Sequence, residues 1–397
     1  MALKIGFDAK RTFNNFTGLG NYSRTLIETL VRYYPENEYH LFTPKLSDDV
    51  RLDFIKKQAS ISVHTPPQYL RNIHAVWRSY FIKNAIEKAG IDIFHGLSHE
   101  LPLVLPNTVK TVVTIHDLIH ERYPEYYPFL DRKIYTLKFK RACEKADVVV
   151  AISEQTKQDI IDFYGIEAGK IQVIYQSCHP QFYLNSPPNR LRKGQYFVEN
   201  IDKKYNLPEN YILYVGTVNE RKNLLSLVKA MQLIVRRDSY GDNQDDIHLV
   251  AVGNGGAYFE KVKKYVHENH LTQRVHFLTN PNFSDFPYFY KKAKAFVLPS
   301  FFEGFGIPII EALWSGCPVI VSEGSCFAES AGKDALFINP HSAEDIATAI
   351  NKILTDNTLR EGFILRGCKF VEKFHEKKIG AQWMTLYQKL MEKGEKK

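Results

Sequence analysis

The sequence predicts an α/β protein with two doubly wound, parallel-sheet domains. Its 397 residues suit two domains of about 100–200 residues each better than one. Short apolar segments alternate with amphipathic segments, which is the pattern of strands and helices in parallel-sheet folds. This periodicity fails once near the middle, between Cys178 and Asn206, where Pro180, Pro187 and Pro188 interrupt it. We therefore expect two Rossmann-like domains on either side of this break.

Each half supplies its own series of elements. We predict six strands in the N-terminal half, with a helix over Asn21–Tyr34 in the first gap. These strands are Lys4–Asp8, Tyr39–Phe42, Ile91–Phe94, Lys110–His116, Val148–Ser153 and Ile171–Ile174. The C-terminal strands are Tyr211–Gly216, His248–Gly253, Val275–Leu278, Ala295–Pro299, Pro318–Val321 and Ala335–Ile338. Helices are predicted at Asn223–Arg236, Ala257–His270, Pro308–Ser315, Ala343–Leu354, Leu359–Phe370 and Lys378–Glu392.

These elements set the expected domain boundaries. Residues 1–182 form the N-terminal domain and residues 183–205 a linker or insertion that includes the basic stretch Arg190–Lys193. Residues 206–375 form the C-terminal domain. The last segment, 376–397, is expected to be a helix that packs back on the N-terminal domain.

Composition narrows the class of protein. Hydrophobic residues make up 44% and charged residues 24%, as in globular proteins. No apolar run reaches the roughly 18 residues that cross a bilayer, and the start does not resemble a signal peptide, so we expect a cytoplasmic protein. The five cysteines show no CxxC spacing, which argues against a disulfide framework or a zinc site. The net charge of +8 fits anionic ligands or an anionic membrane, and no nucleic-acid-binding module accompanies it.

The first candidate motif is the pair Gly18 and Gly20, between the first strand and a strong helix. Glycines there let the backbone approach a phosphate at the helix N-terminus. The alternative is a simple tight turn, which the motif alone favours. The third glycine of GxGxxG and an acidic residue after the second strand are both missing, which disfavours a dinucleotide oxidoreductase.

The second motif follows the strand YILYVG, where Arg221 and Lys222 precede a helix. Ligands bind at the carboxyl ends of parallel strands in such folds. A planar guanidinium and a compact ammonium suit the diphosphate of a leaving nucleotide. The alternative is a solvated basic helix start, which the helix dipole opposes by a few tenths of a kcal/mol.

The most informative stretch is PSFFEGFGIPIIEALWSGCPVIVS, which holds Glu303 and Glu311 eight residues apart. A strand, a loop and a helix opening on a proline follow one another there. The loop amides of Gly304, Phe305 and Gly306 can face the same ligand as the two carboxylates. Carboxylates accept well from vicinal hydroxyls, so this motif indicates a sugar and a ribose.

At this point the sequence resembles the large retaining family of nucleotide-sugar glycosyltransferases numbered four, in its mannosyltransferase-like branch. The resemblance rests on TGLGNYSRTL, TIHDLIHERYPEYY, ADVVVAISEQTKQDI, YVGTVNERKNL, LVAVGNGG and EGFGIPIIEAL, in order along nearly the whole chain. It implies the GT-B fold, in which two Rossmann-like domains face a cleft, and a metal-independent hexosyl transfer with retention.

The resemblance also implies roles for single residues. Arg221 and Lys222 would bind the diphosphate, Glu311 the ribose and Glu303 the donor sugar. The implied catalytic residues are His116, Arg221, Lys222 and Glu303. The implied donor-binding residues are Gly18, Gly20, Gly216, Asn223, Gly253, Gly304, Phe305, Gly306, Ile307 and Glu311.

Histidines end two of the N-terminal strands. A lone histidine there is more often structural, but the resemblance places His116 at the donor sugar or reaction centre. Asp117 is a candidate acceptor-side residue or an orienting residue of the loop. His95 and His99 are candidates for acceptor contact.

No Asp-x-Asp occurs in the chain, so a two-carboxylate metal site has no candidate and we expect no metal or other cofactor. Cations and helix amides would then stabilise charge on the leaving diphosphate. The expected substrates are GDP-mannose first and a saccharide or lipid-linked saccharide acceptor, as in surface polysaccharide synthesis. The base contacts expected near Val252–Gly256 and Leu278–Pro281 do not distinguish guanine from uracil.

Three other functions stay open from the sequence. They are a nucleotide-sugar 2-epimerase, a sugar phosphorylase and a non-catalytic partner of the same fold. Two aromatic and basic segments, RNIHAVWRSYFIKNAIEKAG and YYPFLDRKIYTLKFKRACEKA, suit either a core-facing stripe or peripheral contact with the inner face of an anionic membrane.

Overall fold

The computed structural model describes residues 2–70, 73–183, 201–234 and 247–395. It contains two compact units, residues 1–179 with 374–397 (unit 1) and residues 180–373 (unit 2). Most of the predicted linker, including Arg190–Lys193, lies outside the described residues. The described end of that range forms helix α9 (Ile201–Tyr205) in unit 2.

Unit 1 is built on a seven-stranded parallel sheet in the order β3-β2-β1-β4-β5-β6-β7. Its strands are β1 (Lys4–Asp8), β2 (Glu38–Phe42), β3 (Ile61–His64), β4 (Ile93–Gly96), β5 (Lys110–Ile115), β6 (Val148–Ala151) and β7 (Ile171–Val173). The predicted parallel sheet is confirmed, but the prediction of six strands is wrong. The additional strand, β3, lies at an edge and is only partly buried, so it lacks the apolar run that marks buried strands.

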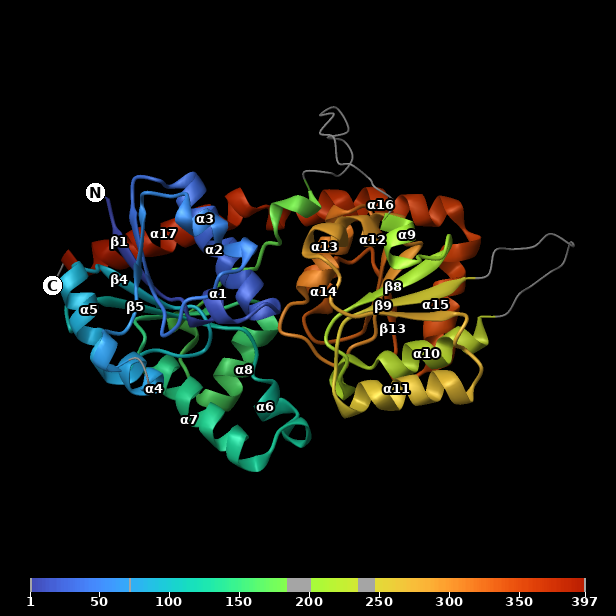
Figure 1. The fold of residues 1–397 in the computed structure, drawn as a ribbon, viewed down its shortest axis with the longest axis horizontal. Coiled ribbons are helices and arrows are strands. Elements are labelled where there is room, and N and C mark those ends of the chain that lie inside the picture. Colours follow the sequence, from blue (N-terminus) through green and yellow to red (C-terminus); the bar gives the residue numbers. More distant parts are fainter. Residues whose placement is uncertain (1, 71–72, 184–200, 235–246, 396–397) are drawn as a thin grey trace, which may run out of the picture. The chain divides into compact units, whose positions relative to one another are not determined.

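Helices cover both faces of this sheet (Figure 1). They are α1 (Lys10–Asn14), α2 (Gly18–Tyr33), α3 (Asp53–Lys56), α4 (His74–Val76), α5 (Ile82–Ala89), α6 (Ile119–Arg122), α7 (Phe129–Lys145), α8 (Glu154–Tyr164) and α17 (Glu376–Glu395). In Figure 1, α2 and α17 lie on one side of the sheet and α4, α7 and α8 on the other.

The C-terminal helix α17 is an integral part of unit 1. The Glu376 carboxylate accepts hydrogen bonds from Arg32 Nη1 at 2.7 Å and from the Tyr33 hydroxyl at 3.0 Å, both on α2. Trp383 and Tyr387 of α17 are fully buried. The helix thus contributes large aromatic side chains to the core of the N-terminal fold.

Unit 2 repeats the architecture with a six-stranded parallel sheet in the order β10-β9-β8-β11-β12-β13. Its strands are β8 (Tyr211–Val215), β9 (His248–Val252), β10 (Val275–Leu278), β11 (Ala295–Leu298), β12 (Val319–Ser322) and β13 (Leu336–Ile338). All five residues of β8 are buried, as expected for a central strand covered on both faces.

The helices of unit 2 after α9 are α10 (Leu224–Leu233), α11 (Ala257–Glu268), α12 (Phe286–Lys292), α13 (Ile307–Trp314), α14 (Phe327–Ala331), α15 (Ala343–Thr355) and α16 (Asn357–Val371). The sequence analysis missed the short helices α12 and α14. The last two residues of the predicted helix Asn223–Arg236 lie outside the described residues.

Candidate active site

Two neighbouring strands of unit 2 bring three charged side chains together. Arg221 and Lys222 follow β8 in a 3₁₀ turn, and Glu303 follows β11, which pairs with β8. Lys222 Nζ lies 2.5 Å from Glu303 Oε1, and Arg221 Nη1 lies 3.2 Å from Glu303 Oε2. Arg221 Nη1 also donates to the carbonyl of Phe302. The structure therefore places these three predicted residues at one carboxyl-terminal edge of the sheet.

In this cluster two cationic side chains share one carboxylate. The side chains of Arg221, Lys222 and Glu303 are 17%, 12% and 9% exposed. Burial alone would raise the pKa of Glu303, but the adjacent Lys222 and Arg221 cations hold it at about 2. Burial lowers the pKa of Lys222, and the Glu303 carboxylate opposes this change. Two partly buried cations that share a single carboxylate can bind a further anionic group.

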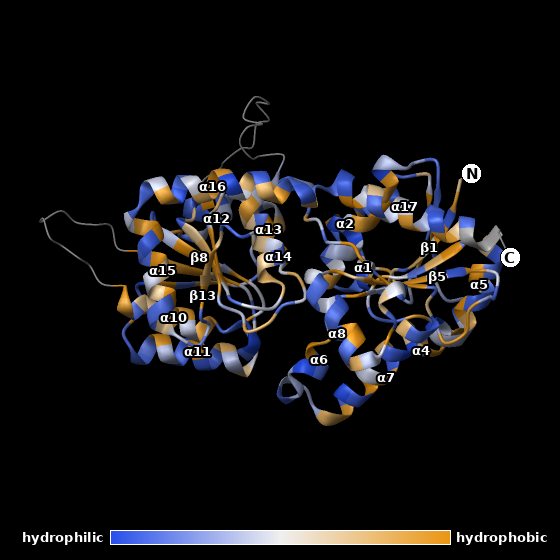
Figure 2. Ribbon diagram, turned by 180° about the vertical axis from the view of Figure 1, so that it is seen from behind, coloured by the Kyte–Doolittle hydropathy of each residue, from blue (hydrophilic) through white to orange (hydrophobic). Residues whose placement is uncertain are grey.

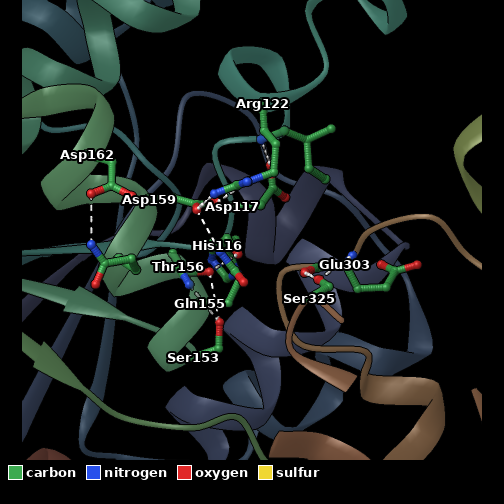
Figure 3. A network of polar contacts seen from close by, with 12 residues as sticks. His116, Asp117, Arg122, Ser153, Gln155, Thr156, Asp159, Asp162, Glu303 and Ser325 are labelled. Carbon is green, nitrogen blue, oxygen red and sulfur yellow. Dashed lines mark hydrogen bonds and ion pairs between the residues drawn. The ribbon is translucent and has the colours of Figure 1, made fainter. Parts of the chain in front are cut away.

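Backbone contacts fix both loops of the cluster. Asn219 Oδ1 accepts from the amide of Lys222 at 3.0 Å and so holds the 3₁₀ turn. Ser325 accepts from the amide of Glu303 at 3.2 Å and donates to its carbonyl at 2.9 Å; Figure 3 shows this pair. Asn219 and Ser325 were not predicted as site residues, because neither side chain carries a charge, although Asn219 belongs to the motif YVGTVNERKNL.

Asn223, a predicted donor-binding residue, has its side chain engaged within unit 2. Its Nδ2 donates to the carbonyls of Pro299 at 3.1 Å and Pro340 at 2.7 Å, and its Oδ1 accepts from Ser226 at 2.7 Å. These bonds join the ends of separate loops. In this structure Asn223 positions the loop that carries the two cations.

The predicted donor-binding glycines lie beside these loops. Gly216 and Gly253 follow β8 and β9, and a Cβ on Gly253 would lie 1.9 Å from the Gly216 carbonyl oxygen, so the two backbones need glycine to approach. Gly306 has a φ of +88° and precedes α13. The other members of this loop and helix start are Gly304, Phe305 and Ile307, of which Gly304 and Phe305 are buried.

Glu311 has a different environment from Glu303. It lies on α13, is 7% exposed and accepts a 2.9 Å hydrogen bond at Oε2 from the Tyr290 hydroxyl. Burial raises the pKa of its carboxyl to about 7, while the bond from Tyr290 acts in the opposite direction. The carboxyl pKa values of the two motif glutamates therefore differ, because Glu303 is paired with cations and Glu311 with a neutral hydroxyl.

In unit 1, His116 follows β5 and is held at both ring nitrogens. Because a carbonyl only accepts, Nε2 donates to Leu97 O at 2.9 Å, and Nδ1 then accepts from Gln176 Nε2 at 3.0 Å. Burial lowers the pKa of the ring to about 3, so it is neutral. The His116 carbonyl accepts from Thr156 (Figure 3). Gln176 was not predicted, because no sequence motif marks it.

Asp117 orients the next loop. Its Oδ1 accepts from the amide of Ile119 at 3.2 Å, where α6 begins. Close by, Arg122 of α6 forms an ion pair with Asp159 of α8, also drawn in Figure 3. This observation fits the orienting role that the sequence left open for Asp117.

His95, a candidate for acceptor contact, has its ring engaged inside unit 1. His95 is completely buried, with Nδ1 2.8 Å from the Tyr387 hydroxyl and Nε2 2.8 Å from Thr114 Oγ1. Both nitrogens are occupied inside the core of unit 1, because α17 covers this strand end. The sequence predicted that the last helix packs on the N-terminal domain, but not that Tyr387 of this helix contacts His95.

His99 differs from His95. It adopts a φ of +63°, its ring stacks on Phe139 with centroids 4.3 Å apart, and its buried Nδ1 has no hydrogen-bond partner among the described residues. An unsatisfied buried nitrogen on a left-handed non-glycine residue is a feature that clusters at binding sites. His99 remains the better of the two acceptor-side candidates.

At the first glycine motif, α2 begins at Gly18. Asn15 Oδ1 accepts from the amides of Thr17 at 3.0 Å and Gly20 at 3.1 Å, so the Gly20 N–H is already used within the loop. A Cβ on Gly20 would lie 1.7 Å from the Asn15 carbonyl oxygen, whereas one on Gly18 would meet open space. The fold thus explains Gly20 as a packing requirement, and a phosphate contact remains a prediction for Gly18.

The described residues contain no group of three or more His, Cys, Asp or Glu side chains placed to hold a metal ion. None of the described helices combines the length and apolarity needed to cross a membrane.

Solved structures share the overall fold. Sucrose-phosphate synthase from Thermosynechococcus elongatus matches with a TM-score of 0.74 at 21% identity, over 98% of this chain and 99% of that one. HepE from Anabaena, crystallised with UDP and glucose, matches with a TM-score of 0.71 at 16% identity, over 98% and 100% of the two chains. Both are GT-B proteins, so the predicted fold class is confirmed.

Sequence relatives agree with this fold. O-antigen chain mannosyltransferase B of Escherichia coli is 27% identical over 98% of this chain and 100% of its own length. O-antigen chain mannosyltransferase RfbU of Salmonella typhimurium is 32% identical over 64% of this chain and 63% of its own. Family models match both halves, as Glycosyltransferase Family 4 over residues 16–181 and Glycosyl transferases group 1 over residues 197–370. The chain therefore belongs to the group 1 glycosyltransferases and is a glycosyltransferase.

Proposed function

We propose that the protein transfers mannose from a nucleotide diphosphate sugar, GDP-mannose first, to a saccharide or lipid-linked saccharide in surface polysaccharide synthesis. The choice of sugar and pathway is supported by the end-to-end similarity to O-antigen chain mannosyltransferase B. The observation that carries the chemistry is the cluster after β8 and β11, in which the cations Arg221 and Lys222 both contact the carboxylate of Glu303.

In the proposed mechanism, the diphosphate of the donor takes its place against Arg221 and Lys222. Negative charge grows on the diphosphate as the bond to the anomeric carbon breaks, and fixed cations stabilise this charge most in the transition state. Glu303, released from part of its ion pairing, accepts hydrogen bonds from the hydroxyls of the donor sugar. No metal ion is required, because the two side chains neutralise the leaving group.

We further propose that the reaction retains the anomeric configuration. The leaving phosphate departs from the face that the acceptor hydroxyl attacks and takes up the hydroxyl proton. Analysis of the product anomer by NMR tests this point. A product with the inverted configuration would exclude the retaining mechanism and leave the donor assignment intact.

The donor is tested by thermal shift against GDP, UDP, ADP and their sugar conjugates, with and without EDTA. We expect GDP and GDP-mannose to raise the melting temperature, because a ligand at 100 times its Kd adds about 2.7 kcal/mol to the free energy of unfolding. The rise should be the same with and without EDTA, because no metal ion takes part in binding. A shift with UDP alone would identify a UDP-sugar as the donor instead of GDP-mannose. The absence of any shift would favour a phosphorylase or a non-catalytic subunit, and conversion of the donor without acceptor would favour an epimerase.

A further inference from the structure

Unit 1 exposes an unusual number of large apolar side chains on neighbouring segments. Among the described residues, eighteen large hydrophobic side chains are exposed, and only Leu233 and Leu365 of these belong to unit 2. Ten of the eighteen come from α4 with the residue before it, from the π-helical turn Trp77–Phe81 that follows α4, from a loop after β4, and from α7. They are Ile73, Val76, Tyr80, Phe81, Leu103, Val104, Phe129, Leu130, Ile134 and Leu137.

Helix α7 shows the pattern most clearly. Leu130, Ile134 and Leu137 are 73%, 49% and 72% exposed, and their i, i+4, i+7 spacing puts them on one face. The opposite face is the packed one, where Ala142 and Cys143 are buried in the core of unit 1. An ordinary surface helix carries polar residues on its outer face, so these three leucine and isoleucine side chains are not explained by the packing of unit 1.

Hydrogen bonds connect these three segments. The amide of Leu103 donates to the carbonyl of Ser79 in the π-helical turn at 2.9 Å, and Arg141 Nη2 of α7 donates to the carbonyl of Leu103 at 3.0 Å. Figures 1 and 2 both show α4 beside α7, and Figure 2 shows hydrophobic stretches on α7 between hydrophilic ones. We call the ten exposed residues the apolar face.

Basic side chains flank the exposed apolar row of α7. Helix α7 contains six lysines and arginines and two acidic residues. Lys133 and Lys140 are exposed on one side of the leucine row, and Lys138 is exposed on the other. Helical spacing places all three within a turn of the apolar residues. Helix α7 therefore combines exposed apolar groups with an excess of positive charge, although Lys138 lies 3.8 Å from the Glu100 carboxylate.

This combination selects one kind of partner. Protein interfaces are depleted of lysine, and nucleic acids offer nothing to an aliphatic row of leucine and isoleucine. An anionic bilayer accepts both, because apolar side chains enter the acyl boundary while lysines and arginines remain at the negative headgroups. We propose that the apolar face docks unit 1 on an anionic lipid bilayer as a peripheral, non-spanning contact.

The proposal goes beyond the proposed function and does not require it, since docking is independent of donor chemistry. The test is flotation of the full chain with vesicles of phosphatidylcholine alone or with about one third phosphatidylglycerol. We expect the protein to float with the anionic vesicles only and to lose binding at high salt. Replacing Lys133 or Lys140 by Gln should weaken binding about fivefold each.

Leu137→Glu is the decisive variant, and Leu365→Glu is its matched control. Both side chains are 72% exposed on helices, but Leu365 lies on α16 of unit 2. We expect Leu137→Glu to weaken vesicle binding by about tenfold or more and Leu365→Glu to leave it unchanged. Equal melting temperatures of the two variants would confirm that neither change unfolds the protein.

Three results would overturn the proposal. They are no flotation of the wild-type chain with anionic vesicles, equal flotation of Leu137→Glu, and a wild-type dimer in gel filtration that Leu137→Glu converts to a monomer. The last result would assign the face to a second copy of the chain. The nucleotide-induced thermal shift of Leu137→Glu separates this question from the donor assignment, because a variant that keeps the shift has an intact nucleotide site.

Discussion

Lys222 Nζ lies 2.5 Å from Glu303 Oε1. The Glu303 carboxylate thereby contacts the same ammonium group that would bind the diphosphate of the donor. An anionic ligand competes with Glu303 for Lys222 and Arg221. We predict that Glu303→Gln binds GDP roughly tenfold more tightly, because a charged competitor becomes a neutral one. Turnover should fall, since a carboxylate contact to the donor sugar is lost.

Isothermal titration calorimetry measures the affinity in this experiment. Glu323→Gln is the control, because Glu323 is exposed and lies in the loop after β12. An unchanged or weaker affinity of Glu303→Gln for GDP would show that the carboxylate does not compete with the diphosphate.

Arg221→Ala should act mainly on turnover. The guanidinium is expected to stabilise charge that develops on the leaving diphosphate, and removal of one such donor typically costs about 10²–10³-fold in kcat. Arg221→Lys should recover part of the loss, because it restores the charge without the planar fork. Steady-state kinetics with the donor found by thermal shift provides the readout. A higher KM at unchanged kcat would assign Arg221 to ground-state binding instead.

The same ion pairs predict a dependence of stability on pH. The pKa of Glu303 is held at about 2 in the folded protein, below its ordinary value of 4.5. A lowered pKa means that its contribution, about 3 kcal/mol, is present above pH 4.5 and is lost as the pH falls towards 2. Urea unfolding at pH 7, 5 and 3 should show a loss below pH 5 that is smaller in Glu303→Gln. The same pH dependence of the free energy of unfolding in wild type and Glu303→Gln would contradict a contribution from the Glu303 ion pairs.

The sequence predicted the architecture well because buried parallel strands are apolar along their whole length. It missed β3, where Ser62 and His64 break the apolar run at an exposed edge. The charged cluster after β8 and β11 was predictable, because strands of one parallel sheet end at one edge. It was not predictable that Glu303 would pair directly with Lys222, since that depends on the order of strands in the sheet.

The uncharged residues that position the site were not predictable from the sequence, because their contacts also depend on the tertiary fold. Gln176, Asn15 and Tyr290 contact predicted site residues only because the chain folds back between distant segments or through a tight loop. His95 shows the converse, because its strand-end position suggested access while Tyr387, almost 300 positions further along the chain, covers it. Such contacts are tertiary, and no local pattern records them.

Glu311 should destabilise the fold at high pH. Its pKa is raised to about 7 by burial, so the ionised carboxylate is disfavoured in the folded state. The cost appears as the pH rises from 4.5 and is complete above pH 7. We predict that Glu311→Gln raises the melting temperature relative to wild type at pH 8 but much less at pH 5. Tyr290→Phe removes the 2.9 Å bond to Glu311 and should lower the melting temperature at both values. A pH-independent effect of Glu311→Gln would contradict a perturbed carboxyl.

Acid should destabilise unit 1 through its buried histidines. Burial lowers the pKa of His95 and of His116 to about 3, whereas the unfolded chain takes up their protons near pH 6.5. Each neutral ring therefore contributes fully to the free energy of unfolding above pH 6.5. This contribution is lost as the pH falls towards 3, at about 1.4 kcal/mol per pH unit for each ring. His95→Gln should therefore be less stable than wild type at pH 7, because the bonds to Tyr387 and Thr114 are disturbed, but its stability should fall less steeply below pH 6.5. Urea unfolding between pH 7 and 4 measures the slope, and His267→Gln, an exposed position on α11, is the matched control. An identical slope in His95→Gln and wild type would mean that the His95 ring takes up a proton within the folded core.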